Sequence, residues 1–289
     1  MAFEDIMSKV QGWVVGAETV AALGAKLALA QTGATAPPAI ATALDAVIAA
    51  AGLAEIDELP PPQQAMLLGL TRLYARQMVD VLDEPGREPG WSFTHPDILD
   101  GWGRGSMMVP PMIVGATPAL ADIESFLDVG TGVGLLACAA AAIWPRASIV
   151  GIDPWGPSLE RAHANVGRAS LGDRITLRDQ RLADLEDTDA YDCAWVPTFF
   201  LTEDDLEAAL PALVRAVKPG GWIVLGRMRT ATDPLAQALN VFRTVRGGGT
   251  DLDPKRAVEL LQNAGCADVQ VASAPPVAPL ELILGRGPD

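Results

Sequence analysis

Histidine and cysteine are scarce in this chain of 289 residues. There are two histidines, His95 and His163, and three cysteines, Cys138, Cys193 and Cys266, which lie far apart in the sequence. Structural zinc sites are built from closely spaced Cys and His ligands, so we expect that the protein holds no metal. An odd number of scattered cysteines favours reduced thiols in a cytoplasmic protein.

Basic residues are also few. Lys and Arg number 21 against 36 Asp and Glu, so the formal net charge is −15. A protein needs Lys and Arg to displace counterions from phosphates, so this charge argues against a nucleic-acid partner. No uncharged apolar run approaches the ~20 residues that span a bilayer, and Glu4 and Asp5 give the N-terminus the wrong charge for export. We therefore expect no membrane partner either.

Hydrophobic residues are abundant at 49%, and they follow two different patterns. Residues 1–116 are rich in Ala and Leu at helical spacing, as in segments 40–51 and 63–82. Residues 84–116 add Gly, Pro and Trp, and we interpret them as a connector that packs against another part of the protein or a ligand. The sequence predicts a helical N-terminal domain over 1–116 and a second domain over 117–289.

From residue 117 onward, short β-prone runs alternate with helical patterns. The runs are Ser125–Val129, Ser148–Ile152, Ile175–Leu177, Tyr191–Val196, Gly221–Leu225, Asp268–Ala272 and Leu280–Leu284. The helical patterns cover 135–143, 158–169, 203–217 and 254–264. This alternation predicts an α/β domain with a parallel sheet covered on both faces. The last two runs lack a helix between them, which predicts an antiparallel hairpin at one edge.

The most informative segment covers residues 126–135, where an apolar strand leads into alternate glycines and an Ala-rich helix. Gly130, Gly132 and Gly134 suit a sharp turn where a ligand approaches the backbone, beside the free N–H groups of a helix N-terminus. The spacing does not fit a dinucleotide fingerprint, because its last position is neither Gly nor Ala. Asp128 would repel a pyrophosphate, but it suits a ligand that carries an ammonium group.

A second carboxylate, Asp153, follows the next predicted strand about twenty residues later, where an acid in this architecture binds ribose hydroxyls. Pro154 and Trp155 come directly after it. The Trp155 ring either lies against an adenine or packs at the start of a helix, and the sequence leaves both readings open.

These motifs, with Lys218-Pro219-Gly220-Gly221 ahead of a strand, resemble the class I S-adenosylmethionine-dependent methyltransferases from about Pro118 to the C-terminus. The resemblance implies a Rossmann-like, doubly wound, mostly parallel seven-stranded sheet and S-adenosylmethionine as cofactor. It places the glycines near the methionine part, Asp128 near the ammonium group and Asp153 on the ribose. The cofactor-binding residues so implied are Asp128, Gly130, Thr131, Gly132, Gly134, Asp153, Pro154, Trp155, Asp179, Gln180 and Pro197.

One position departs from the pattern of the family. Related enzymes often carry Gly-Asp after the third strand, where the acid meets the adenine amino group. This chain has Asp179-Gln180-Arg181 there. Either the Asp179 carboxylate or the Gln180 amide is expected to substitute.

Three subclasses of the family fit poorly. The segment 195–200 lacks the Asn/Asp-Pro-Pro-Tyr motif of enzymes that methylate amino groups of nucleic-acid bases. The ends of the fourth and fifth strands lack the acids of metal-dependent catechol-type enzymes, and Met228-Arg229-Thr230 lacks the histidine base of plant-type enzymes. Methyl transfer from a sulfonium needs mainly alignment. We therefore expect metal-independent, in-line O-methylation of a small or medium hydrophobic metabolite in natural product biosynthesis.

The expected substrate pocket is apolar and is formed by Pro197 and the connector residues 91–112. Its candidate residues are Trp102, Arg104, Met107, Phe199 and Phe200. Arg104 lies between two glycines and could anchor a carboxylate, and His95 is the one plausible imidazole base, although an exposed loop residue before a proline is the simpler reading. The Trp and Met residues could equally form a dimer interface, since related enzymes commonly form homodimers through the N-terminal helical region. Two alternatives stay open, a protein or peptide methyltransferase and a cofactor-binding regulator or cyclase.

Overall fold

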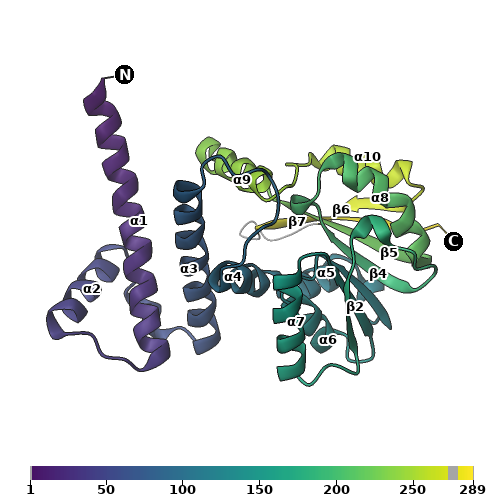
Figure 1. Cartoon of the computed structure of the whole chain (residues 1–289), viewed down its shortest axis with the longest axis horizontal. Helices are drawn as coiled ribbons and strands as arrows, with labels where there is room; N and C mark the ends of the chain where they lie inside the picture. The colour runs from purple at the N-terminus through teal and green to yellow at the C-terminus, as the bar shows by residue number, and fades with distance from the viewer. Residues whose placement is uncertain (1, 273–278, 289) are drawn as a thin grey trace. The chain divides into compact units, whose positions relative to one another are not determined.

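The computed structural model describes residues 2–272 and 279–288, and the chain forms two compact units (Figure 1). The first unit comprises Met1–Pro85 and His95–Gly105, and the second comprises Gly86–Thr94 and Ser106–Asp289. The first is entirely helical in its described part and the second holds the sheet. The predicted combination of a helical N-terminal region with an α/β domain is confirmed.

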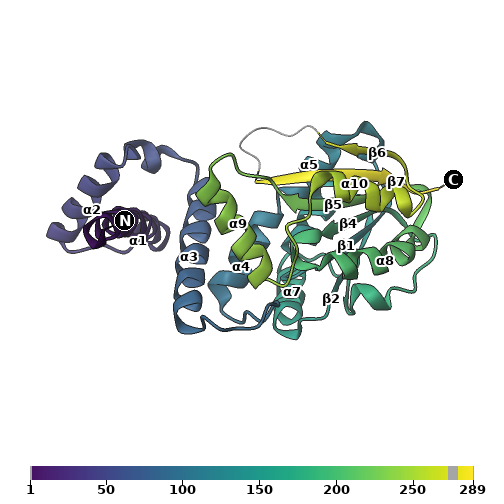
Figure 2. The same cartoon turned by 90° about the horizontal axis from the view of Figure 1, so that it is seen from above.

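The second unit is built on a seven-stranded sheet with the order β3-β2-β1-β4-β5-β7-β6. Its strands are β1 (Ser125–Val129), β2 (Ser148–Asp153), β3 (Ile175–Asp179), β4 (Tyr191–Pro197), β5 (Val217–Met228), β6 (Ala267–Val271) and β7 (Leu280–Arg286). The first five strands pair in parallel, whereas β7 runs antiparallel to both β5 and β6. The predicted mostly parallel sheet with an antiparallel pair at one edge is therefore confirmed (Figure 2).

Helices cover both faces of this sheet. The helices that flank the sheet are α5 (Val109–Ala116), α6 (Leu135–Ile143), α7 (Gly156–Arg168), α8 (Glu203–Ala216) and α10 (Pro254–Asn263), whereas α9 (Pro234–Arg246) contacts the turn after β4. Figure 1 shows α6 and α7 on one face and α8 and α10 on the other. The core cluster between the sheet and α8 and α10 includes Leu127, Leu210 and Leu261, all nearly inaccessible to solvent. Short turns η2 (Pro118–Leu120), η3 (Leu182–Asp184) and η4 (Thr198–Phe200) complete the unit.

Two details differ from the sequence-based expectation. The Lys218-Pro219-Gly220-Gly221 segment lies inside β5 as an irregularity, because the pairing of β5 with β4 shifts register there and Gly220 has φ +69°. Helix α9 was not predicted, although Asp233 caps it by accepting a hydrogen bond from the backbone N–H of Ala236. The same Asp-Pro pair begins α10 at Asp253, so the signal was present twice.

The strand order reverses between β1 and β4, which makes their carboxyl ends the expected ligand crevice of an open α/β sheet. Asp128 is the next-to-last residue of β1, Asp153 ends β2 and Pro197 ends β4. The topology thus brings three predicted site residues to one edge of the sheet.

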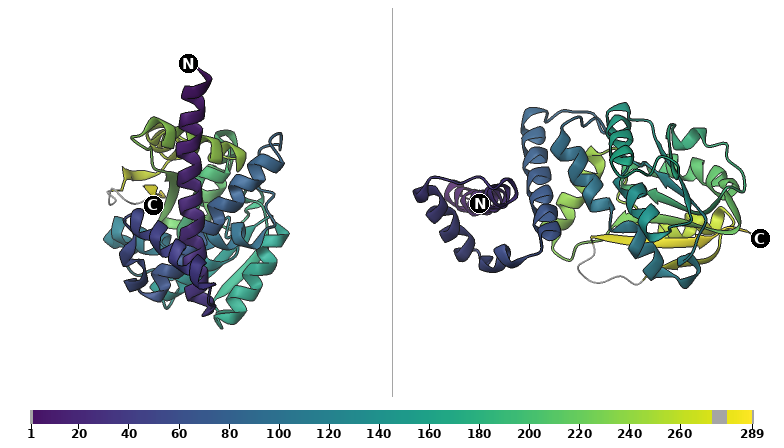
Figure 3. Two further views of the ribbon diagram at one scale, coloured as in Figure 1. Left: turned by 90° about the vertical axis from the view of Figure 1, so that its left-hand side faces the viewer. Right: turned by 90° about the horizontal axis from the view of Figure 1, so that it is seen from below.

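The helical unit contains α1 (Phe3–Thr32), α2 (Pro38–Ala50), η1 (Ala54–Glu58), α3 (Pro61–Asp83) and α4 (Pro96–Ser106). One hydrophobic cluster of this unit comprises Leu27, Ile48, Ile56 and Leu68. The first half of α1 projects beyond α2 and α3 (Figure 3), and every residue from 2 to 18 is exposed. Among the described residues, α1 is the one helix long and apolar enough to cross a membrane by length and composition, with 6% of its apolar window buried.

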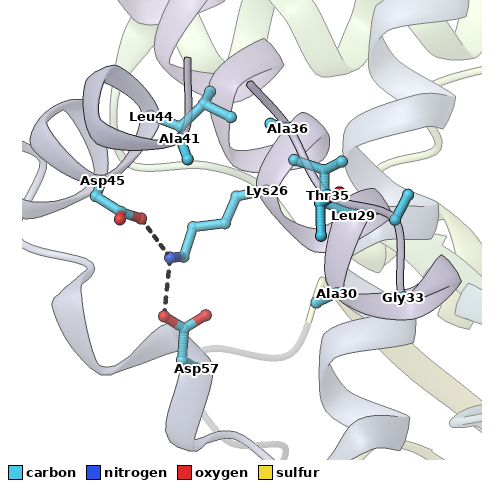
Figure 4. A pocket seen from close by; sticks show the side chains of 11 residues that line it. Lys26, Leu29, Ala30, Gly33, Thr35, Ala36, Ala41, Leu44, Asp45 and Asp57 are labelled. Carbon is cyan, nitrogen blue, oxygen red and sulfur yellow. Dashed lines mark hydrogen bonds and ion pairs between the residues drawn. The ribbon is translucent and has the colours of Figure 1, made fainter. Parts of the chain in front are cut away.

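A groove opens between α1 and α2 (Figure 4). Lys26 lies in it, with its Nζ 2.7 Å from an Asp45 oxygen and 2.8 Å from an Asp57 oxygen. These two hydrogen bonds raise the pKa of Lys26. The rest of the lining is mostly small and apolar, including Leu29 and Leu44.

Candidate functional site

The turn after β1 is shaped by three glycines in the left-handed region. Their φ values are +64° at Gly130, +55° at Gly132 and +73° at Gly134. A Cβ at Gly134 would also lie 3.1 Å from Cβ of Ala162 on α7. Side chains other than glycine are strained in this backbone region, so the turn needs these residues and leaves the backbone open to a ligand.

Asp128 is fully buried beside this turn. One carboxylate oxygen, Oδ2, accepts a hydrogen bond of 2.7 Å from the Thr131 hydroxyl. The other oxygen, Oδ1, is buried and has no hydrogen-bond partner among the described residues. Burial raises the pKa of Asp128 to about 7, in spite of the Thr131 hydrogen bond, which lowers it. A cationic group is what this carboxylate lacks.

Thr131 orients Asp128 because its own position is fixed. Its backbone N–H donates to the Ile152 carbonyl at 3.0 Å, and its side chain packs on Gly151 of β2. A Cβ at Gly151 would lie 2.6 Å from the Thr131 Oγ1, so the absence of a side chain on β2 makes room for this hydroxyl. Thr131 thus acts on the predicted site through Asp128.

Asp153 is held by two backbone groups. Its Oδ2 accepts the N–H of Gly132 and its Oδ1 accepts the N–H of Trp155, both at 2.8 Å. Burial raises the pKa of Asp153, while these two bonds lower it. The bonds fix the carboxylate orientation, and each oxygen keeps a lone pair that can accept a hydroxyl.

The remaining predicted cofactor residues lie around these acids. Asp179 is exposed at the end of β3 and pairs with Asp153 in the strand register. Gln180 donates from its side-chain Nε2 to the Asp184 carbonyl at 2.8 Å, so that amide group is bonded within its own turn. Pro197 is buried, and its Cγ would lie 3.4 Å from a Cβ at Gly130, so it covers the glycine turn from the β4 side.

An aromatic cluster of Trp91, Phe93, Phe199 and Phe200 forms next to the end of β4. The centroid distances are 5.1 Å for Trp91 and Phe93, 4.8 Å for Trp91 and Phe200, and 4.6 Å for Phe199 and Phe200. Two members come from residues 86–94, a segment without helix or strand that we call the strap. The structure thus brings Phe199 and Phe200 together with the first part of the predicted connector.

The other predicted substrate residues lie elsewhere. His95, Trp102 and Arg104 belong to the helical unit, whereas Met107 lies in the sheet unit and is 44% exposed. The His95 Nδ1 accepts the backbone N–H of Asp97 at 3.2 Å, which makes it a cap of α4. The roles of these four residues in catalysis or substrate binding stay predictions.

Arg227 is a buried charge that the sequence analysis did not single out. It follows the apolar core of β5 and is 4% exposed. Its guanidinium donates to the Leu252 carbonyl at 2.7 Å, to Glu281 at 2.8 Å and to the Thr230 hydroxyl at 3.0 Å. A charged residue that directly continues an apolar strand needs such partners, and that rule could have identified it.

Residues 126–221 match a family model described as a methyltransferase domain. This part of the chain is a class I, S-adenosylmethionine-dependent methyltransferase domain. The methyltransferase domain is 34% identical over 117 residues to a release factor glutamine methyltransferase of Rhodopirellula baltica. That alignment covers 39% of this chain and 38% of the relative, so the chain spans well under half of that protein's length.

Solved structures resemble the methyltransferase and helical regions together. Human N-acetylserotonin methyltransferase in complex with S-adenosylmethionine has a TM-score of 0.69 at 16% identity, covering 100% of both chains. An O-methyltransferase family protein from Burkholderia thailandensis has a TM-score of 0.68 at 16% identity, covering 100% of this chain and 99% of that one. At these identities the likeness establishes the fold.

The geometry of the methyltransferase domain fits its cofactor. Asp128 offers a buried oxygen without a partner to a cationic group, and Asp153 is oriented to accept hydroxyls. At Gly132 the nearest atom outside its chain neighbours would lie 3.9 Å from an added Cβ, which leaves space beside the backbone of the turn. Within the described residues there is no group of three or more His, Cys, Asp or Glu side chains arranged to hold a metal.

Proposed function

We propose that the protein transfers a methyl group from S-adenosylmethionine to an oxygen of a small or medium hydrophobic metabolite, without a metal, in natural product biosynthesis. The carrying observation is the aromatic cluster, an apolar wall next to Pro197 and the cofactor crevice. An apolar wall with few polar groups suits a hydrophobic acceptor. The O-methyltransferase that matches the chain over its full length supports the same choice.

The mechanism rests on alignment by this chain's own residues. The bound cofactor supplies an electrophilic methyl group on a sulfonium. We propose that Asp128 holds its ammonium group, Asp153 its ribose and Asp179 its adenine amino group. The aromatic cluster and Pro197 position the acceptor and exclude water. Positioning of this kind supplies up to about 7–11 kcal/mol in favourable cases.

We assign no general base. The His95 Nδ1 already accepts a backbone N–H at the start of α4. An aligned acceptor hydroxyl needs a base only when its pKa is high. His95→Ala is therefore expected to keep measurable turnover; complete loss with intact cofactor affinity would show that the imidazole is the base.

A second candidate is methylation of a protein glutamine, which the similarity to the release factor glutamine methyltransferase favours. The end of β4 speaks against it. There the chain reads Val196-Pro197-Thr198-Phe199, with no amide or acid to hold the nitrogen of an acceptor. The Thr198 hydroxyl is buried and donates to the Gly226 carbonyl at 3.0 Å.

We further propose that residues 1–116 cap the site and form a homodimer and that residues 117–289 bind the cofactor. The exposed apolar side chains of α1, such as Trp13 at 60%, support a homodimer through this region. The three cysteines are free thiols, which is consistent with the proposed cytoplasmic location.

The test uses the purified full chain, S-adenosylmethionine with a labelled methyl group, and two acceptor pools: a small-molecule extract and a protein fraction. Label in an ether-type product of the small-molecule pool supports the proposal. Label in protein glutamine would establish the second candidate. Tight cofactor binding with no labelled product in either pool would favour a regulator or cyclase.

A further inference from the structure

Trp155 contacts two parts of the sheet unit at once. Its backbone N–H donates to Asp153 Oδ1 at 2.8 Å, and its indole Nε1–H donates to the Phe93 carbonyl, also at 2.8 Å. Trp155 and Phe93 are 62 residues apart in the sequence. A single residue therefore links the acid assigned to the cofactor ribose with the strap.

The strap depends on contacts of this type for its order. It contains no helix or strand, and a segment without its own backbone ladder opens more readily than its surroundings. At its middle, the Gly90 N–H donates to the Arg246 carbonyl at 3.2 Å. Gly90 also packs closely on Gly248, where an added Cβ would lie 2.9 Å from the Gly90 Cα.

The strap carries half of the aromatic cluster. The Trp91 ring meets the rings of both Phe93 and Phe200, and the Arg87 guanidinium lies 4.2 Å from the centroid of the Phe93 ring. If the strap opens, the apolar wall beside the end of β4 loses these rings. The order of the strap therefore decides whether the acceptor side is complete.

We propose that Trp155 is a positioning residue that couples cofactor binding to the docking of the strap. The proposal rests on the assignment of Asp153 to the cofactor. A ligand that binds the Asp153 carboxylate favours the turn 153–155 in which the Trp155 indole reaches the Phe93 carbonyl. By thermodynamic reciprocity, a docked strap strengthens cofactor binding by the same factor.

This role differs from stacking of the Trp155 ring on an adenine. Trp155→Phe keeps an aromatic ring at this position but removes the indole N–H, together with part of the ring surface. If Trp155 mainly stacks, the variant loses little besides some stacking surface, and the strap is unaffected. If Trp155 couples the two sites, the variant binds the cofactor but no longer transmits that binding to residues 86–94.

The experiment is hydrogen–deuterium exchange on the full chain with and without S-adenosylhomocysteine, with affinities from calorimetry. In the wild type, S-adenosylhomocysteine is expected to slow amide exchange in the strap about fivefold, a moderate coupling. In Trp155→Phe the slowing falls below about twofold, while the affinity stays within about fivefold of the wild type. Protection of the strap that persists in Trp155→Phe, or that never occurs in the wild type, overturns the proposal.

A matched control is available in Trp144→Phe. The Trp144 indole donates to the Leu120 carbonyl at 2.9 Å, the same kind of bond in the core away from the strap. This variant is expected to keep the protection of the strap by S-adenosylhomocysteine. Its loss there too would show that any indole deletion loosens the fold, and would overturn the specific role of Trp155.

A second variant tests the coupling at the middle of the strap. Gly248→Ala strains a backbone with φ +91° and also places a Cβ 2.9 Å from the Gly90 Cα. It is expected to undock the strap and to weaken S-adenosylhomocysteine binding about fivefold by reciprocity. An unchanged affinity with an undocked strap overturns the proposal, even if Trp155→Phe does not fold. If the wild type does not bind S-adenosylhomocysteine at all, the proposed function fails first, which calorimetry shows directly.

Discussion

Among the two buried acids of the site, Asp128 has the fewer hydrogen bonds to its carboxylate. Its carboxylate is fully buried, and one oxygen has no partner among the described residues. Burial raises the pKa to about 7 because the charged form is poorly solvated there. The ligand-free protein therefore holds this group at a cost in stability that a bound ammonium group offsets.

Asp128→Asn is expected to stabilise the ligand-free protein and weaken cofactor binding. The folded pKa lies above the unfolded value of 3.8, so the fold loses stability as the pH rises from about 4 to about 7 and stays at the lower level above that. A neutral amide removes this loss, and at about pH 8 we expect a rise of about 2–4 °C in Tm for each 1 kcal/mol relieved. Differential scanning calorimetry measures it; a lower Tm at that pH would contradict the assignment.

Cofactor affinity is expected to depend on pH through the same group. Below pH about 7 the Asp128 carboxyl is protonated in the free protein, so binding of an ammonium group must release a proton and affinity falls with decreasing pH. Above about pH 8 the α-amino group of the cofactor loses its own proton. Calorimetry across this range should show the tightest binding between the pKa of Asp128, about 7, and that of the cofactor amino group, about 8. In Asp128→Asn the affinity should no longer fall as the pH decreases below about 7.

Asp153→Ala is expected to weaken S-adenosylmethionine binding at least about tenfold, since the bond to ribose hydroxyls is lost with the charge-assisted acceptor. It also leaves the N–H groups of Gly132 and Trp155 without their acceptor. Asp173→Ala, at an exposed acid before β3, is the control and should bind normally. Equal affinities for both variants would remove Asp153 from the site.

For single residues, position in the sequence predicted which side chains lie near the crevice, but it did not predict their hydrogen bonds. Asp128 and Asp153 are recognisable because each stands at a strand end near a glycine turn. Asp128 Oδ1, which has no hydrogen-bond partner in the described part of the chain, and the indole bond from Trp155 to Phe93 both depend on side-chain placement across segments distant in the sequence. No local pattern encodes such contacts.

The glycine turn is the element on which the site depends. Gly132→Ala is strained by its φ of +55° alone, since the nearest other atom to an added Cβ lies 3.9 Å away. Gly134→Ala adds a close approach of 3.1 Å to Ala162 on α7. We expect unfolding free energies to fall by about 1–2 kcal/mol for the left-handed strain in both variants, and further for Gly134→Ala.

Chemical denaturation measures these losses, and Gly167→Ala is the control. Gly167 lies on the exposed face of α7 with no atom within 4 Å of an added Cβ, so alanine there should stabilise the helix by up to about 1 kcal/mol. Equal stability of Gly132→Ala and Gly134→Ala would show that α7 yields to the extra methyl group.

Helices and strands were largely predictable where the spacing of apolar residues agrees with the residues that mark the start and end of an element. Helix α6 has the predicted limits, and α10 begins at the predicted Pro254. Helix α9 was missed because it has few buried residues, so its hydrophobic residues recur only weakly at helical spacing. It also follows a loop-like stretch, although Asp233-Pro234 marks its start. In β5 the glycines of the Lys-Pro-Gly-Gly segment suggested a turn, whereas pairing to β4 keeps it in the sheet.

At the scale of the whole molecule, the exposed first half of α1 calls for a partner. Trp13 and Val14 are 60% and 48% exposed, in the stretch 2–18, where every residue is exposed. If α1 pairs with a second copy, Trp13→Asp with Val14→Asp should give monomers that still bind S-adenosylhomocysteine. Light scattering after gel filtration measures this.

The control for this double variant is Lys9→Glu, which changes charge at an exposed position of α1 without adding a polar group to an apolar one. It should keep the oligomeric state of the wild type. Monomers in the wild type itself would contradict the homodimer proposal, whatever the variants do.

The chain passes between the two units at residues 85–86, 94–95 and 105–106, so neither unit is a single continuous stretch. Chimaeras that exchange the N-terminal half of related enzymes at one junction near residue 116 would import a foreign strap along with the foreign helices. Grafts that aim to alter acceptor preference should therefore retain the native segment 86–94, or move it together with the Trp155 loop that it binds.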